Sequence, residues 1–304
     1  MTPQASRGLE IWAVEGVAHS ILFYLDLSTL DALLHVIQAT DELRGYLKDD
    51  PLWAALTNAH FGGPQDSELA VEALPFQGRD WEWTSRERAC VQLQGFLQSL
   101  DDRGRFDGAV TVVEGDVEHV NDIAGQPLDG IVFPTNPHLT NHHVGAAAAV
   151  FRRAGRGLEE FVSDPSFRGA RPVGSVVVTP AFDTGVAKLI HCVGPNITMT
   201  RCYEVLGQTY ENAMDAVLRE NLQCVVMASV STGSLGVSPK EGAQVAMRAI
   251  KKFLVRSDWR GKLAIVCNEE HVRQAFASAK RAALKDFNVL SPLPDNDVAD
   301  QWLR

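Results

Sequence analysis

The chain has 304 residues and a formal net charge of -10 at pH 7, with 45% hydrophobic and 22% charged residues. A globular chain of this size can bury more than one core, so we expect two domains. The acidic balance does not favour a nucleic-acid partner. We find no apolar run long enough to span a membrane and no basic leader before an apolar segment, so neither a membrane partner nor secretion is expected.

The five cysteines are odd in number, widely spaced and free of any CxxC pair. This pattern argues against a disulfide scaffold and against a zinc knuckle, so we predict no metal site. A reducing compartment follows, and the expected location is the cytoplasm, the nucleus or both. Cys192 and Cys267 are expected to be small core residues, because nothing near them in the sequence would lower a thiol pKa.

The first half is predicted to be helical, because apolar residues recur at helical spacing between residues 11 and 61. Asp26 stands where a capping side chain would begin the second helix. Residues 62–80 carry the glycines and prolines of an irregular connector, and a further helix is predicted over 84–100. The expected boundaries are a helical domain over 9–62 and a connector with a helix over 63–107.

After Asp107, short apolar runs alternate with amphipathic segments, which is typical of a layered α/β domain. Six strands are predicted, over 109–115, 129–134, 174–180, 188–194, 223–231 and 262–267. Helices are predicted over 144–155, 201–220, 239–256 and 269–286. The α/β domain is expected to cover 108–287, and residues 288–304 are expected to form a polar tail.

One loop of this half has the composition of a phosphate site. Gly233 and Gly236 stand among Ser231, Thr232 and Ser234, directly before a predicted helix. Backbone N–H groups of such a loop can converge on an anion at a helix start. An ordinary strand-to-helix turn uses the same residues, so this loop alone does not decide between the two.

Six segments occur in one order: GDVE at 115–118, DGIVFPTN at 129–136, AG at 154–155, GSVVVTP at 174–180, LIHCVGP at 189–195 and SVSTGSLGVSP at 229–239. The series resembles the macro domain, an ADP-ribose-binding module. The resemblance implies a three-layer α/β/α fold with a mixed, mostly parallel six-stranded sheet. It also implies ADP-ribose as the ligand, without a further cofactor, in a cleft beyond the strand ends.

The resemblance assigns roles to individual residues. Asp116 would accept a hydrogen bond from the adenine amino group, beside the backbone N–H of Val117, and Asn136 would address the distal ribose. Two phosphate loops would hold the diphosphate. Their residues are Val144 and Gly145 in the first loop, and Ser231, Thr232, Gly233, Ser234, Leu235, Gly236 and Val237 in the second.

The chain also departs from the family pattern. Phe133 replaces the first Asn of the family's NAAN motif, and TNHHVG at 140–145 replaces a triple-glycine loop. Neither Gly145 nor Ala147 supplies the aspartate that helps hydrolytic macro domains to activate water, so turnover by that route is not expected. Val237 and Cys267 stand where the family often has an aromatic platform.

Histidines in the altered loop offer a different catalytic route. His142 and His143 are weak candidates for a base in a rebuilt hydrolase site, and the alternative is that both are solvated loop residues. His191 is expected to be satisfied inside the domain. If His142, His143 or Phe133 filled the space between the two loops, the nucleotide would be excluded.

The segment from Gly16 to Gly62 resembles an F-box, most clearly in DDPLWAAL and HFG. The resemblance implies a Skp-type adaptor of a cullin-RING ubiquitin ligase as the partner. Helices this short are expected to leave apolar residues for that partner, namely Ile21, Leu22, Leu25, Leu30 and Leu34. The alternative is that this face packs within the protein. Trp53 is expected to anchor the core.

Three functional hypotheses follow from these patterns. In the first, the chain is a substrate receptor that presents ADP-ribose or an ADP-ribosylated protein to a ubiquitin ligase. In the second, it is an ADP-ribosyl or acetyl-ADP-ribose hydrolase that uses His142 or His143. In the third, it is a degenerate macro fold that binds protein alone.

Overall fold

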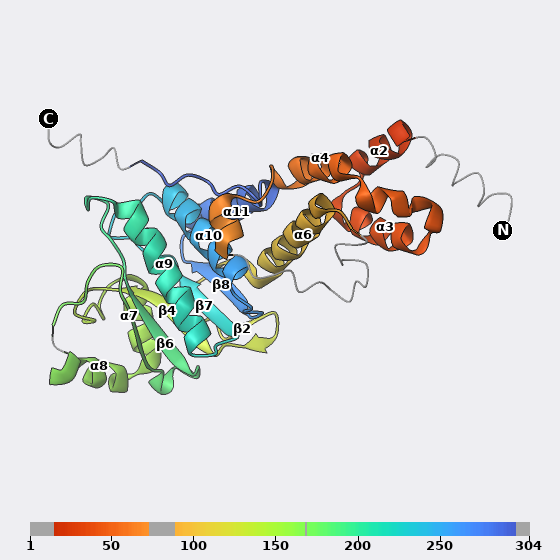
Figure 1. The fold of residues 1–304 in the computed structure, drawn as a ribbon. Coiled ribbons are helices and arrows are strands. Elements are labelled where there is room, and N and C mark those ends of the chain that lie inside the picture. The colour runs from red at the N-terminus through yellow and green to blue at the C-terminus, as the bar shows by residue number, and fades with distance from the viewer. Residues whose placement is uncertain (1–14, 73–88, 168, 296–304) are drawn as a thin grey trace, which may run out of the picture. The chain divides into compact units, whose positions relative to one another are not determined.

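A computed structural model describes residues 15–72, 89–167 and 169–295 (Figure 1). The chain divides into two compact units. Of these described residues, the first unit, the helical unit, contains those up to Gly104 together with Leu284–Leu290. The second, the α/β unit, contains those of Arg105–Ala283 and residues 291–295.

Short helices make up the helical unit: α2 (Glu15–Tyr24), α3 (Leu27–Ala39), the 3₁₀ helix η1 (Asp41–Lys48), α4 (Asp50–Phe61), α5 (Ser67–Glu72) and the first part of α6 (Val91–Ala109). Local signals set their ends. The Asp26 carboxylate accepts the N–H of Thr29 at 2.8 Å and begins α3, as predicted. Gly62, at φ 81°, ends α4 in the left-handed conformation.

Aromatic side chains fill the core of the helical unit. Trp53, Phe61 and Phe96 are completely buried, and the Phe96 ring lies 5.2 Å from Trp53 and 5.3 Å from Phe61, centroid to centroid. The indole N–H of Trp53 donates to the carbonyl of Tyr46 at 2.7 Å, so its polar atom is satisfied. The expectation that Trp53 anchors the core is confirmed.

The predicted partner face is largely inside this core. Leu22, Leu30 and Leu34 are at most 1% exposed, so the prediction that these three side chains face a partner is wrong. The physical reason is that α2 packs against α4 and α3 packs against η1. Ile21 and Leu25 are half-buried. The large apolar side chains that α2 and α3 expose are Val17, Phe23, Tyr24 and Val36.

A segment from the far end of the chain completes the helical unit. The backbone N–H of Asn288 donates to the carbonyl of Phe61 at 3.0 Å, and its side-chain amide donates to Gly63 at 2.8 Å. Phe287 is completely buried. The unit therefore extends beyond residues 9–62, and residues 288–290 are packed although the sequence predicts a polar tail. The predicted helix over 84–100 is described from Val91 onward and continues to Ala109, while residues 84–88 lie outside the described residues.

A mixed six-stranded sheet forms the α/β unit, with strands in the order β1-β8-β7-β4-β6-β5. The strands are β1 (Val110–Glu114), β4 (Gly130–Thr135), β5 (Val176–Pro180), β6 (Lys188–Val193), β7 (Cys224–Ala228) and β8 (Lys262–Cys267). All neighbours pair in parallel except β5 and β6, which are antiparallel. The predicted mixed, mostly parallel sheet is confirmed. A short hairpin of β2 (Asp122–Ile123) and β3 (Gln126–Pro127) was not predicted.

Helices cover both faces of the sheet, as predicted: α7 (Gly145–Ala154), α8 (Arg156–Ser163), α9 (Cys202–Arg219), α10 (Pro239–Arg256) and α11 (Glu270–Lys285). Alternate strand residues such as Ile131 and Phe133 share a core with α7 and α8. On the other face, α9 and α10 lie side by side (Figure 1). Gly155, at φ 69°, ends α7, and α8, which was not predicted, begins at the next residue. No helix in the described ranges is long and apolar enough to cross a membrane.

Candidate functional site

The α/β unit has a pocket of about 580 Å³ at the carboxyl ends of its parallel strands. Residues that follow β1, β4, β6, β7 and β8 line it: Gly115–Val117, Asn136, Gly194, Ser229 and Asn268. Parallel strands end at the same edge of a sheet, so the fold brings these distant segments together.

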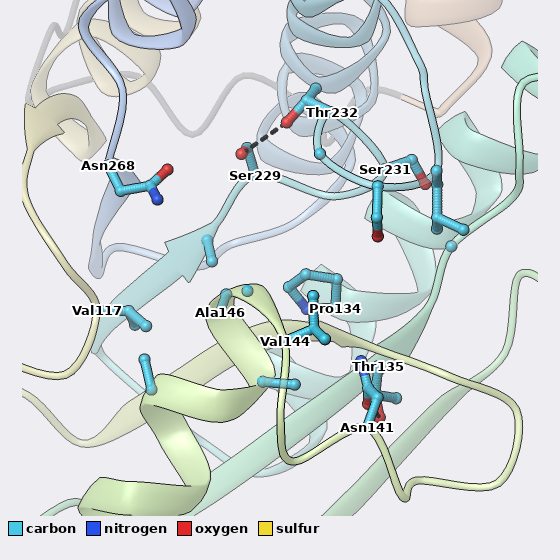
Figure 2. A pocket seen from close by; sticks show the side chains of 18 of the residues that line it. Val117, Pro134, Thr135, Asn141, Val144, Ala146, Ser229, Ser231, Thr232 and Asn268 are labelled. Carbon is cyan, nitrogen blue, oxygen red and sulfur yellow. Dashed lines mark hydrogen bonds between the residues drawn. The ribbon is translucent and has the colours of Figure 1, made fainter.

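The N-terminus of α7 forms one wall of the pocket. Gly145, at φ 62°, and Ala146 line the pocket, and Val144 precedes them as the N-cap (Figure 2). The valine side chain cannot accept a hydrogen bond, so the first-turn N–H groups have no side-chain cap. Together with the positive end of the helix dipole, these N–H groups can bind an anion.

The loop after β7 forms the opposite wall. The Thr232 hydroxyl donates to the Ser229 hydroxyl at 2.8 Å, which braces the loop internally (Figure 2). Ser231 adopts φ 65° and is 4% exposed, and its hydroxyl has no hydrogen-bond partner among the described residues. A buried hydroxyl without a partner at the wall of a pocket is suited to a ligand oxygen.

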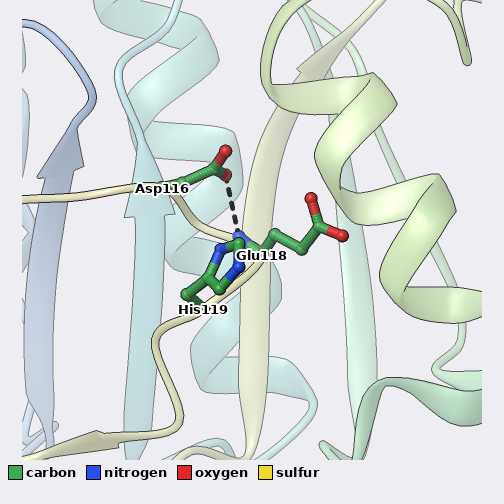
Figure 3. A group of neighbouring side chains, drawn as sticks. All are labelled: Asp116, Glu118 and His119. Carbon is green, nitrogen blue, oxygen red and sulfur yellow. Dashed lines mark hydrogen bonds between the residues drawn. The ribbon is translucent and has the colours of Figure 1, made fainter.

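Asp116 supplies a carboxylate at the end of β1. One of its oxygens accepts the N–H of Glu118 at 3.0 Å (Figure 3). Asp116, Glu118 and His119 bring potential ligand atoms within 4.8 Å of one another, but Glu118 is already paired with Arg152 at 2.5 Å. The cluster by itself does not define a metal site, because exposed acidic groups often gather without an ion. We therefore treat Asp116 as a pocket carboxylate.

Asn136 lines the pocket but uses its side chain within its own loop. Its oxygen accepts the N–H groups of His138 at 3.1 Å and Thr140 at 2.9 Å, and its amide donates to the Thr140 hydroxyl at 3.2 Å. The neighbouring Asn141 accepts the Thr135 hydroxyl at 2.8 Å, and both Asn141 and Thr135 line the pocket (Figure 2). The first role of Asn136 is therefore to shape the loop.

The residues that could have blocked the pocket lie elsewhere. His142 and His143 are absent from its lining. The Nε2 atom of His142 is 3.6 Å from a carboxylate oxygen of Glu159 in α8, and the His143 ring lies 4.0 Å from the His142 ring. Phe133 is completely buried beside His191, at 4.5 Å between ring centroids. None of the three fills the space between the two loops.

The groups predicted to be structural are buried. His191 is completely buried, its Nε2 atom lies 3.0 Å from the Thr179 hydroxyl, and burial lowers the pKa of His191 to about 3. Burial raises the pKa of the thiols of Cys192 and Cys267 to about 12. Both cysteines are core residues without nucleophilic character, as predicted.

The pocket lining overlaps the predicted ligand set without matching it fully. Asp116, Val117, Asn136, Val144, Gly145 and residues 231–235 line the pocket. Gly236 and Val237 do not: Val237 is 1% exposed and its N–H donates to the carbonyl of Ser231 at 3.1 Å, behind the loop. The sequence prediction missed Asn141, Gly194, Asn268 and Glu269. Gly194, Asn268 and Glu269 lie within two residues of the end of a strand. That position is the sequence signal that could have identified these three.

The pocket offers few groups for acid-base chemistry. The carboxylates among its lining residues are Asp116 and Glu269. They follow β1 and β8, which are neighbours at one edge of the sheet, whereas Asn136 follows β4. The end of the pocket near Asn136 therefore has no lining carboxylate that could activate water.

A mixed sheet between helical layers, with an uncapped helix start and a glycine-containing loop at its carboxyl edge, defines an α/β/α domain with a pocket suited to an anionic ligand. The family model of the macro domain matches residues 132–246. A macro domain-containing protein of Listeria monocytogenes is 31% identical over 147 residues, which cover 47% of this chain and 80% of that protein. An O-acetyl-ADP-ribose deacetylase of Klebsiella pneumoniae is 29% identical over 160 residues, which cover 52% and 91%.

Solved structures agree with this assignment. The macrodomain of Oceanobacillus iheyensis with MES bound superposes with a TM-score of 0.52 at 25% identity, covering 57% of this chain and 90% of that one. A variant of that macrodomain with ADPR gives a TM-score of 0.50 at 26% identity, covering 57% and 92%. The chain belongs to the macro-domain family through its α/β unit.

Proposed function

We propose that the α/β unit binds ADP-ribose, free or attached to a protein, and acts as a receptor without turnover. The observation that carries this proposal is the pair of facing anion sites, the N-terminus of α7 and the loop 231–235, in one pocket with the carboxylate of Asp116. Two backbone anion sites suit the two phosphates of a dinucleotide-like ligand. The ADPR complex of the O. iheyensis variant supports the same ligand class.

The ends of the pocket suit the two ends of this ligand. The carboxylate of Asp116 can accept from the exocyclic amine of adenine, whereas the carbonyl of hypoxanthine would face it with a second acceptor. Asn136 and Asn141 lie at the end that would hold the distal ribose. Adenine recognition at Asp116 therefore fixes the orientation of the ligand.

A glycine at the centre of the second loop gives the sharpest test. Gly233 lines the pocket, and a Cβ built there would meet nothing within 4 Å, so a side chain would not strain the loop. We expect wild-type protein to bind ADP-ribose in a calorimetric titration and Gly233→Val to lose most of that affinity. Gly108→Val is the control, because a Cβ there also meets nothing and Gly108 does not line the pocket. Absence of heat at millimolar ADP-ribose would instead favour recognition of protein alone.

Hydrolysis is a second candidate, because relatives such as the Klebsiella pneumoniae protein are named O-acetyl-ADP-ribose deacetylase. The geometry argues against it, since His142 and His143 lie outside the pocket lining and no lining carboxylate is near Asn136. We expect no release of ADP-ribose from a modified protein and no deacetylation of O-acetyl-ADP-ribose. Turnover by wild-type protein that is lost in His142→Ala or His143→Ala would reverse this assignment.

We further propose that the helical unit docks a Skp-type adaptor of a cullin-RING ligase. The support is the F-box-like sequence together with exposed apolar side chains on α2 and α3, of which Tyr24 is 91% exposed. Complex formation with a purified adaptor is expected to be lost in Tyr24→Asp. Val91→Asp is the control, since Val91 is 72% exposed in α6 of the same unit. Lack of complex formation by wild-type protein would remove the ligase role and leave ADP-ribose binding intact.

A further inference from the structure

A buried tyrosine holds the start of the phosphate loop. The ladder between β7 and β8 ends at Ala228, so the N–H of Val230 has no strand partner. It donates instead to the hydroxyl of Tyr210 in α9, at 3.0 Å. Val230 is 1% exposed and Tyr210 is completely buried, so water cannot replace this bond.

The end of β6 restricts the same loop from another direction. A Cβ at Gly194, the residue after β6, would overlap the Ser231 hydroxyl and lie 2.6 Å from a methyl carbon of Val230. The close approach therefore requires glycine at 194. Val230 and Ser231 are held between the end of β6 and the tyrosine hydroxyl, and Ser231 is fixed at φ 65°.

The loop beyond this point pairs its carbonyls and leaves two N–H groups without a protein acceptor. The carbonyls of Ser231, Gly233 and Leu235 accept from Val237, Gly236 and Ile197 at 2.9–3.1 Å. Within the described ranges, the N–H groups of Gly233 and Ser234 donate to no protein acceptor. The positions of these two N–H groups depend on the backbone at the start of the loop. Tyr210 holds that backbone through the Val230 N–H.

We infer that Tyr210 is a positioning residue for the diphosphate part of the ligand, an inference that rests on the proposed binding of ADP-ribose. The hydroxyl does not line the pocket and acts through the Val230 N–H. Burial raises the pKa of Tyr210, so the phenol stays neutral and its contribution does not change between pH 6 and 9. The ligand contacts that depend on the Tyr210 hydroxyl are those made by the loop 231–235.

The test is Tyr210→Phe, which keeps the ring and removes only the hydroxyl that accepts from Val230. We expect the affinity for ADP-ribose and ADP to fall about tenfold, which corresponds to one hydrogen bond of the usual net strength. The affinity for AMP, which lacks the second phosphate, is expected to change less than about twofold, because the base contacts at Asp116 are untouched. The measured quantity is the ratio of the affinity for ADP-ribose to the affinity for AMP. A general loss of stability would not change this ratio.

Tyr203→Phe is the matched control. Tyr203 lies in the same helix, is 3% exposed, and its hydroxyl donates to Glu241 in α10, not to the loop. Amide exchange at Val230 should accelerate in Tyr210→Phe and stay unchanged in Tyr203→Phe. Equal loss of ADP-ribose and AMP affinity in Tyr210→Phe, or no loss at all, would overturn the role of Tyr210. Failure of wild-type protein to bind ADP-ribose would overturn the proposed function itself.

Discussion

Arg153 in the last turn of α7 donates to the backbone carbonyl of Val120 at 2.6 Å. The same guanidinium nitrogen donates to the carbonyl of Val117 at 3.2 Å. The loop that carries Asp116 is thus tied to the helix whose N-terminus lines the pocket. The proposed base and phosphate subsites are therefore both held by α7, and the distance between them depends on this helix.

Replacement of Arg153 by Met is expected to loosen the base subsite. The variant leaves the carbonyl oxygens of Val117 and Val120 without their donor, and we expect a loss of about 1 to 3 kcal/mol in the free energy of unfolding. Affinities for AMP and ADP-ribose should fall together, in contrast to Tyr210→Phe. Calorimetry with both ligands gives the measurement. Arg152→Met is the control, because its ion pair with Glu118 is exposed and is weakened by solvent screening.

Removal of the Asp116 carboxylate is expected to weaken adenine recognition. Asp116→Ala should lose one charge-assisted hydrogen bond, or about 1.5 to 3 kcal/mol of binding free energy for ADP-ribose. The variant should bind the hypoxanthine analogue and the adenine ligand with equal affinity, because the acceptor that distinguishes the two bases is gone. His119→Ala is the control, since His119 is exposed and does not line the pocket. Unchanged affinity in Asp116→Ala would show that the base lies elsewhere.

Much of the α/β unit could be predicted from the sequence because its signals are local. Apolar runs gave all six strands of the main sheet, and β8 was predicted with its observed ends, Lys262 and Cys267. The strand predicted over 223–231 was too long, since β7 ends at Ala228 and the chain turns into the phosphate loop. Small apolar and hydroxyl residues do not distinguish the end of a strand from the start of such a loop.

The errors concern contacts between distant residues. The burial of Leu22, Leu30 and Leu34 depends on helices that follow later in the chain. Asn288 bonds to Gly63 across 225 residues, and no periodicity in the sequence indicates that pairing.

His191 is expected to make the α/β unit sensitive to acid. The Thr179 hydroxyl donates to the carbonyl of Pro180 at 3.1 Å, so it accepts from His191, whose Nε2 atom then carries the proton. Burial lowers the pKa of His191 to about 3, below the ordinary value of 6.5. Between these values the unfolded chain binds a proton that the folded protein does not.

Stability should therefore fall by about 1.4 kcal/mol for each pH unit below 6.5, down to about pH 3, as the contribution of this one group. Above pH 6.5 His191 is neutral in both states and contributes no slope. Urea unfolding of His191→Phe, compared with wild type at several pH values from 7 to 4, should show a flatter decline in the variant. Parallel declines in both proteins would assign the acid sensitivity to other groups.

The helical unit is expected to depend on Asn288. The side chain is 1% exposed and donates to the carbonyl of Gly63 at 2.8 Å, where α4 has just ended. Asn288→Ala leaves that carbonyl without its donor in a buried setting, which should cost about 1 to 3 kcal/mol of unfolding free energy. Thermal unfolding would detect this loss, while ADP-ribose affinity should stay unchanged because the pocket lies in the α/β unit.

Val289→Ala is the neighbouring control, since Val289 is 40% exposed and its truncation should change stability by less than about 0.5 kcal/mol. If both variants unfold at the wild-type temperature, residues 284–290 do not stabilise the helical unit.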